Sequence, residues 1–136
     1  MLTAAIAVWS LVATAQPAGQ EAFRPGAKVY IGPLVDGFDV FLKAALRQMR
    51  VPLTVVELKA DADLEIAGLS LSKKASITRL RPFHSDEVAA ISVTELTSGE
   101  LVFAYDVNKI NSAHGKRSTA EACAKHLKAA LEKKMR

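Results

Sequence analysis

Two strand-like segments joined by a short turn constrain the fold of this chain more than any other feature of its sequence. Residues 87–96 (EVAAISVTEL) and 101–110 (LVFAYDVNKI) carry apolar side chains at alternate positions, which is the period of a strand with one buried face. Gly99 in the connecting turn can take the positive φ that a short hairpin loop demands. The sequence therefore predicts an antiparallel hairpin whose apolar face consists of Ala89, Ile91, Val93, Leu101, Phe103, Tyr105 and Val107.

Two segments with the period of an amphipathic helix stand before and after the strand-rich part of the chain. The first begins at Asp36, a favourable N-cap residue, and ends before Pro52. The second opens at Ser118, and Glu121 completes a capping box with it. The predicted apolar faces are Phe38, Phe41, Leu42, Ala45, Leu46 and Met49 in the first helix, and Ala120, Cys123, Ala124, Leu127, Leu131 and Met135 in the second.

The remaining apolar segments complete an α/β fold of the α+β type. Residues 27–31 (AKVYI), 53–58 (LTVVEL) and 64–71 (LEIAGLSL) are rich in the β-branched and aliphatic residues of buried strands. We expect the first two strands, which a helix joins, to be parallel or separated by one strand, and the later strands to form an antiparallel meander. The predicted architecture is a single mixed sheet of about four to five strands with two helices on one face, in the order β-α-β-β-β-β-α.

The N-terminus has the pattern of an export signal. Residues 2–15 are apolar and uncharged, and they end in Ala13-Thr14-Ala15, whose small side chains suit signal peptidase. A membrane span needs about 20 apolar residues, so the run favours a signal peptide; the alternative is an N-terminal helix that is buried or frayed. We expect a signal peptide over 1–15, a flexible leader over 16–26 and a single domain over 27–136, in a periplasmic or secreted protein without stable membrane insertion after cleavage.

Patterns that would indicate catalysis or metal binding are lacking in the sequence. Cys123 is the single cysteine, which excludes an intramolecular disulfide and a cysteine-based zinc site, and we expect it to act as a small hydrophobic core residue. No histidine stands at a metal-ligand spacing, and no nucleophile motif accompanies the adjacent His84, Ser85 and Asp86. We therefore expect a protein that is not an enzyme and that uses no cofactor or metal ion.

Basic residues are concentrated in two loops. The net charge is +4, and from position 109 onward eight Lys or Arg residues oppose two Glu residues. Residues 72–86 contain no acid before Asp86, and Ile77 and Leu80 are expected to form a short edge strand there. Nucleic acid is not an expected partner, because exposed aromatic residues for base stacking are not evident. The candidate interaction surface comprises Lys73, Lys74, Arg79, Arg81, His114, Lys116 and Arg117.

Two short motifs resemble those of small α/β domains from the bacterial cell envelope. They are an A-D-x-x-x-x-G strand at Ala62–Gly68 and an acidic-x-x-(S/T)-G-x-(V/L) hairpin at Glu95–Val102. Over about residues 27–135 the chain resembles the curli-secretion lipoprotein family, the outer-membrane activators of penicillin-binding proteins and the amino-terminal domain of the Tol-system β-propeller protein. It departs from the lipoprotein members because no cysteine stands near the cleavage site. The resemblance implies a partner-binding module without catalytic residues.

These observations lead to two functional hypotheses. The first is an exported, non-catalytic cell-envelope protein that acts as a protein-interaction module, whose partner is another envelope protein or a second copy of itself. The alternative is a binding protein for a small or polymeric anion, which would use the basic loops 72–81 and 114–117. Salt sensitivity separates the two, because screening weakens binding between exposed charges.

The export signal predicts the N-terminus of the mature protein. When the full chain is produced with a C-terminal tag in its native organism, we expect the envelope form to begin at Gln16, because signal peptidase cleaves after small residues such as Ala15. Intact-mass spectrometry and N-terminal sequencing measure this. The control variant A13L/A15L should keep its leader, and a wild-type chain that retains residues 2–15 in the cytosol would contradict the prediction.

Overall fold

The computed structural model describes residues 21–74 and 85–135, which form a five-stranded mixed sheet with two helices. The elements are β1 (Ala27–Ile31), α1 (Phe38–Gln48), β2 (Leu53–Val56), β3 (Leu64–Lys74), β4 (Ser85–Glu95), β5 (Leu101–Ser112) and α2 (Lys116–Lys133), with short 3-10 turns at Val35–Gly37 and Lys59–Asp61. The strand order is β2-β1-β3-β4-β5. Strand β1 is parallel to β2 and β3, whereas β3, β4 and β5 are antiparallel neighbours. The predicted fold class and element order are confirmed.

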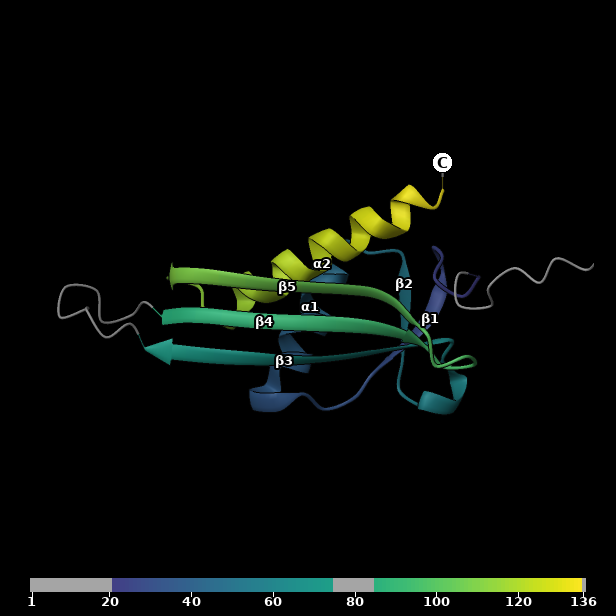
Figure 1. The fold of residues 1–136 in the computed structure, drawn as a ribbon, viewed down its shortest axis with the longest axis horizontal. Coiled ribbons are helices and arrows are strands. Elements are labelled where there is room, and N and C mark those ends of the chain that lie inside the picture. Colours follow the sequence, from purple (N-terminus) through teal and green to yellow (C-terminus); the bar gives the residue numbers. More distant parts are fainter. Residues whose placement is uncertain (1–20, 75–84, 136) are drawn as a thin grey trace, which may run out of the picture.

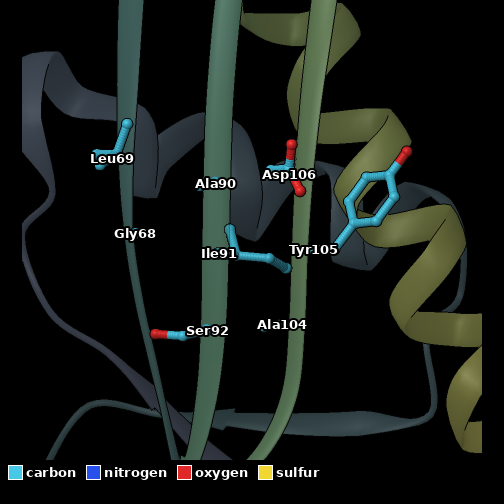
Figure 2. A pocket seen from close by; sticks show the side chains of 8 residues that line it. All are labelled: Gly68, Leu69, Ala90, Ile91, Ser92, Ala104, Tyr105 and Asp106. Atoms are coloured by element: carbon cyan, nitrogen blue, oxygen red, sulfur yellow. The ribbon is translucent and has the colours of Figure 1, made fainter.

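Both helices cover the same face of the sheet (Figures 1 and 2). The core lies between these two layers, and its largest members are Val29, Ile31, Leu64, Ile66, Ile91 and Val93 from the sheet and Phe38, Leu42, Leu46, Cys123, Leu127 and Leu131 from the helices. Two residues of the predicted helix faces are exceptions: Phe41 is 40% exposed at the flank of α1, and Met135 is 70% exposed beyond the end of α2. Neither of the two described helices covers the opposite face of the sheet.

The β4–β5 hairpin is confirmed, with one change near its turn. Gly99 has φ +73°, as the short loop requires. The prediction that Leu101 shares the buried face of β5 is wrong. A bulge at this point pairs Leu101 with Thr94, so that Val102 is the additional residue. Leu101 therefore turns to the opposite face of the sheet, where it is 61% exposed.

The predicted N-cap of α1 is wrong. Asp36 lies in a left-handed conformation with φ 55°, and α1 begins after Gly37, which makes no side-chain cap. The carboxylate of Asp39 supplies the local hydrogen bond instead, because its Oδ1 accepts the backbone N–H of Leu34 at 3.0 Å. A carboxylate in the first turn is also favoured by the helix dipole.

The predicted capping box of α2 is wrong as well. The helix begins before Ser118, with Gly115 as its N-cap residue and without a side-chain cap, and Glu121 pairs with Arg117 at 3.0 Å. A tertiary neighbour lies at this end of the helix: Glu87 is 2% exposed, and its Oε1 would lie 3.6 Å from a Cβ built on Gly115. A buried carboxylate near a helix N-terminus is stabilised by the helix dipole.

Just after helix α1, a residue that is not glycine takes a left-handed conformation. Arg50 has φ +53°, and its backbone N–H donates to the carbonyl of Arg47 while Val51 donates to Leu46 at 3.0 Å. This position in a helix terminus is usually glycine, because an L side chain in the left-handed region costs roughly 1 kcal/mol. The chain thus holds an arginine where glycine would be more stable.

The segment before β1 packs on the domain where the structure describes it. Phe23 is 3% exposed, its ring stacks on Phe103 at 6.0 Å between centroids, and Lys134 Nζ lies 5.6 Å from the Phe23 centroid. The predicted leader over 16–26 is described from Glu21 onward, and the predicted signal peptide lies outside the described residues. Phe23 thus belongs to the hydrophobic core, and Ala22 packs against it.

The close approach of β3 and β4 at Gly68 can be tested by substitution. A Cβ added to Gly68 would lie 2.7 Å from the carbonyl oxygen of Ala90 and 3.2 Å from Ile91 Cγ2, so both backbones would have to separate. We expect Gly68→Ala to lower the free energy of unfolding by about 1–3 kcal/mol, measured by urea denaturation. The neighbouring Ala67→Ser is the matched control, because Ala67 is exposed. Equal stability of the two variants would contradict the close approach.

Candidate functional site

The two basic segments singled out in the sequence lie at the same end of the sheet. Lys73 and Lys74 are the last residues of β3, and Lys74 pairs with Ser85, which in turn pairs with Ser112 just before α2. Arg79 and Arg81, together with the predicted edge strand around Ile77 and Leu80, lie outside the described residues. The strands on either side are longer than predicted, since β3 runs to residue 74 and β4 begins at residue 85.

The basic side chains before and within the first turn of α2 already have partners inside the molecule. Lys116 Nζ lies 3.5 Å from Asp36 Oδ2 and donates to the Asp36 carbonyl at 3.3 Å. Arg117 pairs with Glu121, and His114 is exposed with its backbone N–H on Ser112 Oγ. The pair of Lys116 with Asp36 ties the start of α2 to the turn before α1. An anion bound at this loop would have to compete with these two carboxylates.

Burial and neighbouring side chains affect the titration of Cys123 and Tyr105. Burial raises the pKa of the Cys123 thiol from its ordinary value of 9.0 to about 12, so the thiol stays protonated. Desolvation, with the neighbouring Cys123 and Asp106, raises the pKa of the Tyr105 hydroxyl, and the Tyr105 ring stacks on His126 at 4.1 Å. Within the described ranges, no three His, Cys, Asp or Glu side chains are arranged to hold a metal ion.

The strongest candidate site is the sheet face that carries no helix, here called the outer face. Figure 2 looks onto it, with Leu69 from β3, Ser92 from β4 and Asp106 from β5 in front of the strands and both helices behind. Small side chains at the centre leave a shallow groove of about 470 Å³. It is lined by Gly68, Leu69, Ala90, Ile91, Ser92, Ala104, Tyr105 and Asp106.

The outer face is largely apolar along β3 and β4. Leu71 pairs with Val88 and Leu69 with Ala90, so these side chains form two adjoining cross-strand pairs. Leu69, Leu71 and Val88 are 45%, 59% and 37% exposed, respectively. Large apolar side chains that gather on one exposed sheet face indicate a surface that binds another molecule.

Sequence reasoning missed the outer face, although a signal for it was present. In the segment 64–71 apolar residues stand at both parities, since Leu64 and Ile66 face the core whereas Leu69 and Leu71 face outward. A strand that is apolar on both sides is typical of a sheet with both faces covered. The described helices cover one of these faces. The apolar residues of the other face therefore indicate a surface that another molecule covers.

None of the described helices is long and apolar enough to cross a membrane.

Comparisons with known proteins show the fold and leave the family open. No protein-family model matches the chain, and no curated protein matches it in sequence. Two crystal structures of the PelC dodecamer from Paraburkholderia phytofirmans match with a TM-score of 0.58 at 14% identity, covering 85% of this chain and 94% or 93% of theirs. At this identity the match shows a shared fold alone.

Two further matches are lipoproteins by name. Rare lipoprotein B from Shewanella oneidensis matches with a TM-score of 0.39 at 10% identity, over 79% of this chain and 96% of that one. A minor lipoprotein from Acinetobacter baumannii matches with a TM-score of 0.41 at 9% identity, over 80% and 94%. Matches with TM-scores this low support no conclusion about this chain. The resemblance to the curli-secretion lipoproteins, the activators of penicillin-binding proteins and the Tol-system domain stays a prediction.

The burial of Cys123 predicts both thiol reactivity and a pH effect. The folded protein keeps the thiol protonated up to a pKa of about 12, whereas the unfolded chain loses the proton above 9.0. The unfolded state therefore binds fewer protons between these values, and stability falls as pH rises above about 9. We expect no reaction with a thiol reagent at pH 8 before unfolding, and a smaller loss of stability in Cys123→Ala from pH 8 to 10. Rapid labelling of the native protein would contradict this.

Proposed function

We propose that this chain is an exported, non-catalytic protein of the bacterial cell envelope whose function is to bind protein, and that a second copy of the chain covers its outer face. The observation that carries the proposal is the row of exposed apolar side chains on a sheet face without a helix. Burying one leucine side chain completely contributes about 1.5–3 kcal/mol. Association through Leu69, Leu71 and Val88 on both copies would therefore remove a considerable unfavourable exposure.

The comparison with PelC supports self-association. A protein with the same fold over most of its length is a dodecamer, so this architecture is compatible with assembly from identical copies. The shape of the outer face is also suited to a protein surface, because its groove is shallow and extends across β3, β4 and β5, whose lining residues Figure 2 labels. We include cleavage of the N-terminus and an envelope location in the proposal because residues 2–15 have the pattern of a signal peptide.

The non-catalytic part of the proposal rests on the surroundings of the reactive groups. Cys123 is buried among apolar residues, and the Tyr105 hydroxyl is held protonated beside α2. The groove on the outer face holds one charged side chain, Asp106, among its lining residues. General acid–base catalysis uses a positioned titratable side chain, most often histidine, and no histidine is among the described residues that line this groove.

Anion binding through the loops 72–81 and 114–117 remains the alternative proposal. Lys73, Lys74, His114, Lys116 and Arg117 are gathered at one end of the sheet by strand register, which favours a common surface. The intramolecular pairs of Lys116 and Arg117 speak against it, because a ligand would have to displace a carboxylate from each. Retention on an anionic matrix that is insensitive to salt would remove this alternative.

Self-association through the outer face is tested by light scattering after size-exclusion chromatography of the chain that begins at Gln16. We expect an oligomer for the wild type and dissociation to the monomer for L69K/L71K, because two lysines on each copy cannot be buried together without repulsion. The control V40K/L58K replaces two apolar side chains, each 64% exposed, away from the outer face, and should leave the oligomer intact.

The same experiment can overturn the proposal in two ways. A monomeric wild type at the highest soluble concentration would contradict self-association. An oligomer that persists in L69K/L71K, with a folded circular dichroism spectrum, would place the interface elsewhere and contradict the role of the outer face.

A further inference from the structure

A second groove, separate from the outer face, lies between the C-terminal half of α1 and the edge strand β2. Its volume is about 310 Å³. The lining residues are Lys43, Leu46, Arg47, Arg50, Val51, Leu53, Val55 and Glu57. Three cations thus surround an apolar floor, with Glu57 as the single carboxylate. The composition is that of a surface that binds an anionic group together with an apolar one.

The three cations have no partners among the described residues. No ion pair or side-chain hydrogen bond joins Lys43, Arg47 or Arg50 to another described side chain, in contrast to Lys116 and Arg117 in the first turn of α2. Lys43 and Arg47 are four residues apart and lie on the same side of α1, and Arg50 follows the end of the helix and lines the same groove. Glu57 is the one carboxylate among the lining residues of the groove, and no ion pair joins it to these cations.

The conformation of Arg50 argues for a use of its side chain in this groove. Basic residues in the last turn of a helix are favoured by the dipole, which accounts for Arg47 without a ligand. The dipole does not account for an arginine at φ +53°, a position at which glycine would be more stable. Strained residues of this kind occur where the side chain serves a site.

The open edge of β2 lies in the same groove. Strand β2 pairs with β1 on one side and is the terminal strand of the sheet on the other. Its alternate residues Leu53 and Val55 line the groove, followed by Glu57. An extended peptide that paired with this edge would continue the sheet, and its alternate side chains would face α1 in the same way.

We propose that this groove binds an extended acidic segment of a partner protein, which adds as a strand to the edge of β2. Carboxylates at alternate positions of such a segment lie about 6.6 Å apart, and helix positions four residues apart rise about 6 Å, so two successive acids can meet Lys43 and Arg47. Arginine binds a carboxylate with two parallel hydrogen bonds, which favours Arg47 and Arg50 as the principal contacts. The inference is independent of self-association, because it concerns another surface of the molecule.

The test uses fluorescence anisotropy of a labelled octapeptide in which Asp and Val alternate, titrated with the chain that begins at Gln16. We expect saturable binding that weakens with salt and falls about tenfold or more in R47A/R50G. The variant R50G alone should bind more weakly while its melting temperature rises by a few degrees, because glycine relieves the left-handed strain. The control K125A/K133A removes two exposed charges of α2 and should bind the peptide like the wild type.

Three results would overturn the inference. An equal loss in K125A/K133A would show that overall charge, and not the groove, attracts the peptide. Equal binding of a peptide of the same charge in which proline replaces valine would show that no strand is added to β2, because proline lacks the N–H that edge pairing needs. Displacement of the peptide by alginate at equal charge concentration would assign the groove to anionic polysaccharide. Oligomer size is measured separately, so failure here leaves the outer face untouched.

Discussion

The structure depends on the burial of two helices against one face of a single sheet. A domain of this length has one core, and here it lies between β1, β3, β4 and the helices α1 and α2. Its members include Phe38 and Leu42 of α1, Leu127 and Leu131 of α2, and Val29 and Ile66 of the sheet. Because both helices are on the same side, no helix among residues 21–74 and 85–135 covers the outer face. The exposure of the outer face is therefore a result of how the described layers are arranged.

Sequence patterns predict the elements of this fold better than their ends. Alternation and helical period depend on burial, which the two layers impose, and so the hairpin and the helix faces follow from them. Helix ends depend on neighbours that are distant in the chain. The carboxylate of Glu87 lies at the start of α2 in place of the local box at Ser118, and Lys116 joins that end to Asp36. No pattern local to residues 115–121 contains either partner.

The candidate sites show the same division. Basic residues are visible in the sequence, but whether a cation is available depends on its partners in space. Lys116 and Arg117 are paired, whereas Arg47 and Arg50, which in sequence look like the solvated side of an amphipathic helix, line a groove beside an open strand edge. The outer face was readable in part, since Leu69 and Leu71 break the alternation that Leu64 and Ile66 begin.

The strand order has a consequence for how the chain acquires its fold. Strands β3, β4 and β5 are neighbours in both sequence and space, so they can pair as soon as their hairpins close. Strand β1 lies between β2 and β3, and pairing it with either requires closure of a loop that contains α1. Local pairing forms faster than pairing between distant segments. Strand β1, which precedes the other described strands in the sequence, is therefore among the last to pair. Until it pairs, both of its edges can bind other chains.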